Sequence, residues 1–260
     1  MNLENTSIEI LENNIALLSL ERKPDNSLSI EMMREIIEQY EKLKNNNDIR
    51  AVIITSKIPG YFSNGLDIDE LLKTPVDTKK KVFQALYDLI LCVYGFPKLN
   101  IALLNGHAMA GGAILAAATD FRFFSEGSYR IFFSETKIGL GIPQAILQII
   151  ESVVGIQNLK RTALLAEPLK IDAAIEIGLA DKKFSEKESL ENTIRFAKQI
   201  LAYPDKSYQK TKAAMRKNIL NILKNNTNET LDEFSGFFDE NFEEALLAIK
   251  EKRRPKFIFK

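Results

Sequence analysis

The chain has 260 residues, of which 45% are hydrophobic and 27% are charged, enough for one sizeable core. Lysine and arginine together number 35, as do aspartate and glutamate, so the formal net charge is zero. Nucleic-acid-binding proteins usually carry a basic excess, so this balance argues against a nucleic-acid partner.

The single cysteine, Cys92, excludes a disulfide within the chain and is compatible with a reducing compartment. The opening residues MNLENTSIEI show no basic region, apolar core or cleavage site, and no transit or peroxisomal C-terminal motif is seen. No apolar run approaches the roughly 18 residues of a membrane span. We therefore expect a cytoplasmic protein without a membrane partner.

Residue counts also exclude several chemistries. His107 is the only histidine, and no G-x-S-x-G nucleophile elbow occurs. One histidine and one cysteine cannot supply a usual zinc site, so no metal is expected. The chain has no G-x-x-x-x-G-K-[ST] phosphate loop, and GLGIPQA lacks the third glycine of a dinucleotide fingerprint. Redox and nucleotide-hydrolysing enzymes are therefore disfavoured.

In chain order, SIEILENNIALLSLER alternates on either side of Asn13 and Asn14, which predicts a β-hairpin. The segment from Ser29, SIEMMREIIEQYEKLKNN, has apolar residues at helical spacing and predicts an amphipathic helix. Short apolar runs at 50–56 and 99–106 predict buried strands. A further helix is expected at about 78–96.

Residues 120–133, DFRFFSEGSYRIFF, predict two strands about a Ser-Glu-Gly-Ser turn, and helices are expected near 111–119 and 143–154. This alternation of strands and helices indicates an α/β fold. From about residue 156 the pattern is helical almost throughout. We therefore predict an α/β core over 1–190 and a C-terminal helical region over 191–260.

The last predicted helix, ETLDEFSGFFDENFEEALLAIKEK, carries an apolar stripe on one face. We interpret the stripe as core or subunit packing rather than as a ligand-binding aromatic box. Its length on a terminal helix favours oligomerisation. Its members are Leu231, Phe234, Phe238, Phe242, Ala245 and Ile249.

Two segments place glycine where a predicted strand gives way to a helix: YFSNGLDIDEL at 61–71 and NGHAMAGGAIL at 105–115. Glycine at a helix start leaves backbone N–H groups unobstructed at the positive end of the helix dipole. Two such donors converging on one point are the minimum for an oxyanion hole. The alternative is that these small residues serve only close helix packing.

FSNGLDIDEL, LNGHAMAGGAILAAATDFR and FSETKIGLGIP resemble, in matching order, three motifs of the crotonase (enoyl-CoA hydratase/isomerase) superfamily. The resemblance covers most of the chain and is closest to the mitochondrial-type Δ3,Δ2-enoyl-CoA isomerases. It implies a spiral of ββα turns with a C-terminal helical trimerisation region, assembled as a homotrimer or homohexamer. It also implies an acyl-CoA thioester substrate from fatty-acid β-oxidation, and no separate cofactor because coenzyme A is part of the substrate.

The resemblance also assigns site residues. The N–H groups of Leu66 and Gly111 would hold the thioester oxygen, and Glu135 falls on the catalytic glutamate. Ser134 stands where those isomerases have asparagine. The residues expected to line the CoA-binding turn, chiefly through their backbone, are Ser63, Asn64, Gly65 and Asp67.

A count of acids separates the possible reactions. A hydratase of this family uses two glutamates to activate water, but the first of these positions is Ile114 here. No acid occurs from 107 to 119 or from 136 to 150. Glu135 working nearly alone can still run a 1,3-proton shift that converts a 3-enoyl-CoA to a 2-trans-enoyl-CoA through a dienolate. Phe132, Phe133 and Ile138 predict an apolar setting that raises the pKa of Glu135.

Alternatives remain open at this point. The chain could run another crotonase reaction, such as hydration or thioester hydrolysis, or it could be a non-catalytic acyl-CoA-binding oligomer. His107 is interpreted as a structural or pocket-wall residue. A basic cluster on the helical tail is interpreted as a solvated face, with contact to CoA phosphates as the alternative. The cluster is Lys210, Lys212, Arg216 and Lys217.

Overall fold

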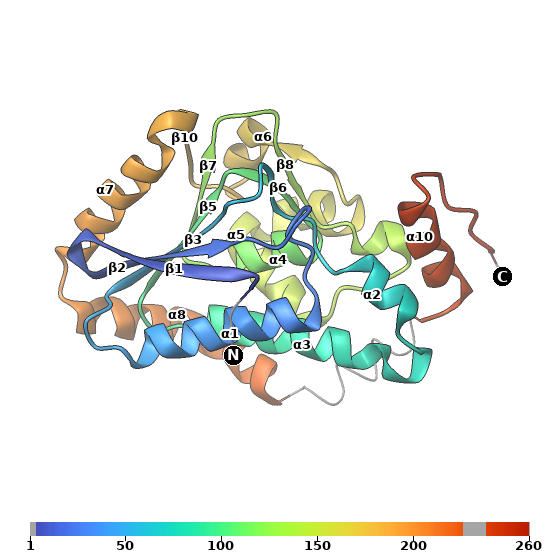
Figure 1. The fold of residues 1–260 in the computed structure, drawn as a ribbon, viewed down its shortest axis with the longest axis horizontal. Coiled ribbons are helices and arrows are strands. Elements are labelled where there is room, and N and C mark those ends of the chain that lie inside the picture. Colours follow the sequence, from blue (N-terminus) through green and yellow to red (C-terminus); the bar gives the residue numbers. More distant parts are fainter. Residues whose placement is uncertain (1–3, 226–237, 260) are drawn as a thin grey trace.

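The computed structural model describes residues 4–225 and 238–259 of the chain. Two β-sheets form the centre, with helices packed around them (Figure 1). The larger sheet has the strand order β1-β2-β3-β5-β7-β10 and is parallel except for the first pair. Its strands are β1 (Thr6–Leu11), β2 (Ile15–Leu20), β3 (Ala51–Ser56), β5 (Leu99–Leu104), β7 (Phe121–Ser125) and β10 (Lys182–Phe184).

The predicted hairpin is confirmed. β1 and β2 pair in antiparallel register through the short 3-10 turn η1 (Glu12–Asn14), where Asn13 and Asn14 both have positive φ. Asparagine tolerates this conformation better than most residues. β3 and β5 are buried along their whole length, as expected for central parallel strands covered on both faces.

The smaller sheet has the order β4-β6-β8-β9, and its first three strands are parallel neighbours. Each of these three strands follows a strand of the larger sheet, so that β3–β4, β5–β6 and β7–β8 form successive ββ units, each leading into helical structure. This is the predicted spiral of ββα turns. The strands are β4 (Gly60–Ser63), β6 (Gly106–Met109), β8 (Arg130–Phe132) and β9 (Leu169–Lys170).

The two strands predicted in residues 120–133 exist, but they do not pair with each other. β7 pairs with β5, whereas β8 pairs with β6 in the other sheet. The turn between them therefore carries the chain from one sheet to the next. Local alternation cannot distinguish this crossing from a hairpin, because both need two short strands and a tight turn.

Helices cover both sheets. Helix α1 begins after Ser29, whose hydroxyl accepts a hydrogen bond from the Met32 amide at 3.2 Å, and α1 packs against α3. Among the described residues, no helix is long and apolar enough to cross a membrane. The helices are α1 (Ile30–Asn45), α2 (Ile68–Lys73), α3 (Val76–Tyr94), α4 (Gly111–Ala117), α5 (Gln144–Leu159), α6 (Ile171–Glu176), α7 (Ser189–Leu201), α8 (Asp205–Asn225) and α10 (Glu240–Lys250), with short turns η2 (Glu135–Ile138), η3 (Lys160–Leu164) and η4 (Glu186–Glu188).

The expectation of helix almost throughout from residue 156 was wrong at two places. The strand β9 pairs with β8, and β10 joins the larger sheet beside β7. Both strands are only two or three residues long, so pairing with the existing sheets, rather than a periodic pattern, creates them. Helix α7 packs on the larger sheet through Ala197 and Leu201. The division at residue 190 stays a prediction.

The C-terminal helix is shorter than its predicted stripe. α10 begins after Asp239, whose carboxylate accepts from the amides of Asn241 and Phe242, each at 2.9 Å. Phe238 precedes the helix, and the predicted positions Leu231 and Phe234 lie outside the described residues. Phe242 and Ala245 are buried against the same chain, which confirms core packing for this part of the stripe.

The basic cluster on α8 is not a solvated face as a whole. Lys212 and Arg216 point inward and form ion pairs with Asp120 at 2.7 and 2.8 Å. This part of the prediction was wrong because the partner acid lies some 90 positions earlier in the sequence. Lys210 and Lys217 are exposed, as predicted.

Candidate active site

Three separate segments meet at one edge of the smaller sheet. The parallel strands β4, β6 and β8 all end there, and the chain continues from them to Leu66, Gly111 and Glu135. Neighbouring parallel strands present their carboxyl ends on the same side, so equivalent positions after each strand become neighbours in space. Topology thus brings together the residues that the sequence motifs singled out.

The Leu66 amide is left unpaired by the local backbone arrangement. Leu28 bridges the first glycine turn: its N–H donates to the Gly65 carbonyl at 2.7 Å, and its carbonyl accepts from the Asp67 amide at 3.2 Å. In such a parallel bridge the intervening Leu66 N–H faces away from Leu28. Gly111 is the first residue of α4, where amides have no acceptor within the helix. Neither amide donates a hydrogen bond within residues 4–225 or 238–259.

Glycine lets the two turns touch. A Cβ on Gly111 would lie 3.6 Å from the Leu66 nitrogen. A Cβ on Gly65, where φ is 90°, would lie 3.2 Å from the Gly111 nitrogen and 2.9 Å from the Met109 carbonyl oxygen. A side chain at position 65 would therefore collide with the second turn. The two free amides are thus placed close enough to share one oxygen acceptor.

Backbone strain lies beside the second donor. Ala110, the residue before Gly111, has φ 46° and ψ −122°, a conformation that glycine adopts far more readily than alanine. Strain of this kind costs about 1–3 kcal/mol and tends to occur at functional sites. It turns the chain sharply between β6 and α4. The Gly111 N–H lies directly after this turn, at the start of α4, whose residues are all buried.

Glu135 is a buried carboxylate with a free oxygen. Its side chain belongs to a residue only 8% exposed, and Oε2 has no hydrogen-bond partner in the described structure. Desolvation by burial raises the pKa of Glu135 from 4.5 to about 7. The predicted apolar setting and its effect on the pKa of Glu135 are therefore confirmed. A carboxyl group with this pKa can accept and return a proton near neutral pH.

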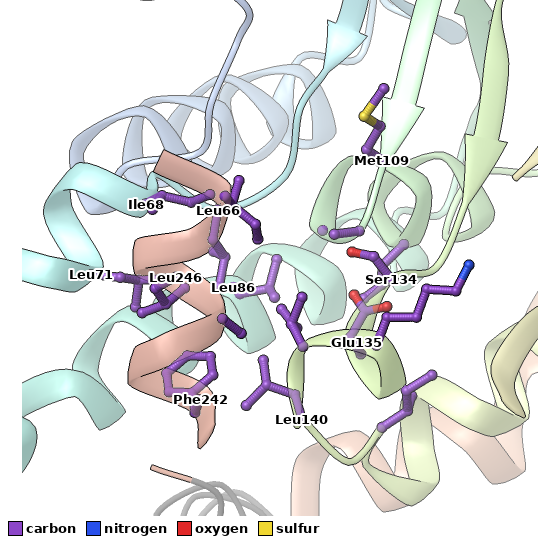
Figure 2. A pocket seen from close by; sticks show the side chains of 18 of the residues that line it. Leu66, Ile68, Leu71, Leu86, Met109, Ser134, Glu135, Leu140, Phe242 and Leu246 are labelled. Atoms are coloured by element: carbon purple, nitrogen blue, oxygen red, sulfur yellow. The ribbon is translucent and has the colours of Figure 1, made fainter. Parts of the chain in front are cut away.

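These groups face one cavity of about 380 Å³. Figure 2 shows Glu135 and Ser134 on one side of the cavity and Leu66, Leu86 and Leu246 on another. Most of its lining is apolar, and Glu135 is its only acidic member among the described residues. Ile114, the position of the first hydratase glutamate, is part of that apolar lining.

The residues predicted from the motifs divide into two groups. Those that line the cavity are Asn64, Leu66, Gly111, Ser134 and Glu135. Ser63, Gly65 and Asp67 are not part of the lining. They hold the first turn in place.

The supporting contacts of this turn are specific. The Ser63 hydroxyl donates to the Asn26 carbonyl at 2.7 Å. Asp67 caps α2 by accepting from the Glu70 amide at 3.0 Å and forms an ion pair with Arg22. The side chains of Ser63 and Asp67 therefore act on the shape of the turn, which agrees with a site built chiefly from backbone.

His107 lies outside the cavity lining. Its Nδ1 accepts a hydrogen bond from the Arg130 amide at 3.1 Å, and its ring packs near Tyr61 and Tyr129. The structural interpretation of His107 is thus confirmed. No cluster of three or more His, Cys, Asp or Glu suited to a metal ion occurs in the described part of the chain.

Sequence reasoning missed the contribution of two distant segments. Leu28 and Arg22 support the first turn, and Phe242 and Leu246 of α10 close the cavity. The apolar stripe of α10 was visible in the sequence. Nothing in the pattern showed that the stripe faces the same cavity as Glu135.

Comparison with known structures identifies the class of fold. The chain superposes on the crystal structure of human mitochondrial delta3-delta2-enoyl-CoA isomerase with a TM-score of 0.92 at 27% identity, covering 96% of this chain and 98% of that one. It is therefore a crotonase-fold protein. The predicted α/β spiral is confirmed by this match.

Sequence comparison places the chain within a family. The model described as enoyl-CoA hydratase/isomerase matches residues 11–259, so this protein belongs to that family. Enoyl-CoA delta isomerase 1, mitochondrial, of Homo sapiens is 28% identical over 87% of this chain and 76% of its own length. A short-chain-enoyl-CoA hydratase of Clostridium acetobutylicum is 26% identical over 98% of this chain and 97% of its own length. Relatives thus include both reaction types.

Proposed function

We propose that this protein is a Δ3,Δ2-enoyl-CoA isomerase that shifts the double bond of a 3-enoyl-CoA to give 2-trans-enoyl-CoA in the degradation of unsaturated fatty acids. The observation that carries the proposal is a cavity whose described lining contains two free amides and one acidic side chain, Glu135. The similarity to proteins named enoyl-CoA delta isomerase supports it.

The first step is removal of a proton from C2. With the thioester oxygen between the Leu66 and Gly111 amides, negative charge that develops on that oxygen is stabilised by two fixed donors. Glu135 takes the C2 proton, and electrons move through C1 to form a dienolate. Losing one such donor typically costs about 10²–10³ in rate.

The second step returns the same proton to C4. The C2 electrons re-form a double bond between C2 and C3, the former C3–C4 bond becomes single, and the thioester carbonyl is restored. A carboxyl with a pKa of about 7 can hold the proton between the two positions and then release it. The apolar lining disfavours loss of that proton to water.

Hydration is the second candidate, because a hydratase is among the relatives. Two-glutamate activation of water needs another acid facing the substrate, and Ile114 supplies only an apolar surface at the relevant position. Thioester hydrolysis and non-catalytic acyl-CoA binding are the remaining alternatives. Water addition to 2-enoyl-CoA at a rate comparable with isomerisation would favour the hydratase.

Substitution Glu135→Gln tests the proposal while keeping the size of the side chain. We expect kcat/KM for 3-enoyl-CoA to fall by about 10²–10⁴, the usual contribution of general acid–base catalysis. Glu35→Gln is the matched control, because Glu35 is also buried but accepts hydrogen bonds from Asn5 and lies outside the cavity lining. Full activity of Glu135→Gln would remove Glu135 from the mechanism.

The proposal also covers the oligomeric state, the location in the cell and the cofactor. We expect a cytoplasmic homotrimer or homohexamer that needs no cofactor beyond the coenzyme A of its substrate. Light scattering coupled to size-exclusion chromatography measures the mass of the assembly directly. A monomer of 29.4 kDa at micromolar concentration would contradict the oligomeric part of the proposal.

A further inference from the structure

The cavity has a mainly apolar end around Phe242, away from Met109. Its walls there come from α2, α3, α5, α10 and the segment that follows η2, and they include Leu71, Leu86 and Ile146. Figure 2 shows Phe242 beside Leu140 and Leu246 at the end of the cavity away from Met109. Most of the cavity lining is apolar, and the polar side chains in it include Tyr87 of α3. A substrate part that suits a mainly apolar lining is a hydrocarbon chain.

Phe242 is held in place from several directions. Its ring centroid lies 5.6 Å from that of Phe238 and 6.4 Å from that of Phe83 on α3. Phe242 itself is fully buried. On the other side, a Cβ placed on Gly139 would lie 3.7 Å from the Phe242 nitrogen. The Phe242 ring therefore packs among aromatic neighbours, and its backbone lies close to Gly139.

An ion pair secures α10 next to this ring. Lys79 on α3 is 2% exposed and pairs with Glu243, the residue after Phe242. The Lys79 ammonium also lies 6.0 Å from the centroid of the Phe242 ring. A buried ammonium that loses its partner is costly, so displacement of this part of α10 is disfavoured. Phe242 thus forms a fixed wall rather than a movable gate.

We propose that Phe242 sets the longest acyl chain that the cavity accepts, and that the substrates are enoyl-CoAs with a hydrocarbon tail that ends against its ring. This inference rests on the proposed function, because it assigns the tail of the same substrate. Each methylene that enters the apolar end strengthens binding about fourfold. The gain stops where the terminal methyl group meets Phe242, because overpacking then opposes further extension.

The test measures binding and turnover over one series of chain lengths. Dissociation constants are determined by calorimetry for saturated acyl-CoAs with even chains from four to sixteen carbons, which cannot isomerise. Isomerisation of the matching 3-enoyl-CoAs is measured in parallel. In the wild type we expect affinity to rise with chain length to a limit and then to level off or fall.

Phe242→Ala should move this limit to longer chains, so that chains beyond the wild-type limit gain at least tenfold in affinity relative to wild type. Phe242→Leu should move it by less and guards against poor folding of the alanine variant. Phe238→Ala is the matched control: it removes an aromatic neighbour of both Phe83 and Phe242, but Phe238 does not line the cavity. The control should leave the limit unchanged.

The outcomes separate the two proposals. An unchanged limit in both Phe242 variants, or an equal shift in Phe238→Ala, would overturn the assignment of Phe242. If saturated acyl-CoAs bind with a Phe242-dependent limit but no 3-enoyl-CoA is isomerised, the assignment of Phe242 survives and the isomerase proposal fails. If no acyl-CoA binds, both proposals fail.

Discussion

Two buried carboxylates in this protein have opposite surroundings. The side chain of Asp120 is 7% exposed and is fully engaged by Lys212, Arg216 and the Tyr208 hydroxyl. Glu135 is comparably buried, but its Oε2 has no partner in the described residues and faces an apolar cavity. A buried carboxylate that is paired with several groups links the secondary-structure elements that carry those groups. An unpaired carboxyl has its pKa raised and becomes available for proton transfer.

The two carboxylates also lie at different places in the fold. Asp120 lies between β5 and β7, where it also accepts from the Asn100 amide at 2.9 Å and receives two cations from α8. It therefore connects the helical tail to the α/β core. Glu135 follows β8, at the edge where strand ends leave the backbone free for a ligand. Asp120 thus lies before a strand of the larger sheet, whereas Glu135 lies after a strand of the smaller sheet.

Breaking the Asp120 cluster should give the largest change in stability. Asp120→Ala leaves Lys212 and Arg216 buried without a counter-charge, and we expect the free energy of unfolding to fall by about 3–5 kcal/mol. Urea unfolding measures this loss. Asp205→Ala, which removes a half-exposed pair with Arg50, is the control and should cost less than about 1 kcal/mol. Equal losses in the two variants would show that the buried Asp120 cluster contributes no more to stability than the half-exposed pair.

The next largest effect on the free energy of unfolding should come from the titration of Glu135. Its pKa is about 7 in the folded state against 4.5 for an ordinary glutamate, so the folded state binds the extra proton between these values. The resulting stabilisation is fully present below pH 4.5 and is lost as pH rises through 7, a change of about 3 kcal/mol. Urea unfolding of wild type and Glu135→Gln at pH 5 and pH 8 should show this loss only in the wild type.

The same titration predicts the pH profile of catalysis. In the proposed mechanism the base form of Glu135 removes the C2 proton, so kcat/KM should increase about tenfold per pH unit below 7 and level off above it. A profile that stays flat from pH 5 to pH 8 would show that Glu135 is not the titrating base. Steady-state assays with one 3-enoyl-CoA over this range are sufficient.

A smaller effect on kcat is expected when the contacts that position the proposed oxyanion donor, the Leu66 amide, are changed. Arg22 donates to the Ser27 carbonyl at 2.9 Å and also pairs with Asp67. It therefore links the segment at Ser27 to the turn that contains Leu66. Lysine cannot make both contacts with the same fork geometry. We expect Arg22→Lys to lower kcat about tenfold with little change in KM, since the Leu66 donor acts mainly in the transition state.

Arg161→Lys is the matched control for this prediction. Arg161 makes a similar two-pronged pair with Glu167, but the pair lies on the surface. It should leave kcat unchanged. An increase in KM at constant kcat for Arg22→Lys would indicate a role in substrate binding instead of donor placement.

The sequence was informative wherever local chemistry decides the outcome. Ser29 marked the start of α1, and the Asn13–Asn14 pair marked the hairpin turn. The motifs around Gly65, Gly111 and Glu135 were recognisable through their resemblance to the crotonase superfamily. The apolar neighbours of Glu135 also predicted the direction of its pKa shift.

Prediction failed where the partner lies far away in the chain. The two strands β7 and β8 were predicted, but the sequence did not show that they belong to different sheets, and β9 and β10 were too short to show any periodicity. Lys212 and Arg216 looked like solvent-exposed bases because their partner is Asp120. Such contacts arise only when the sheets have stacked and the helical tail has packed onto them.

The α/β class, the glycine turns and the single acid at the centre of the proposed chemistry could all be predicted from the amino-acid sequence. These depend on backbone conformation and residue type, which are local properties. The folded chain was needed to show that the Leu66 and Gly111 amides are unpaired within the described residues and adjacent, and that Phe242 lines the cavity. Those facts depend on strand order and long-range packing, which bring together residues that are far apart in the sequence.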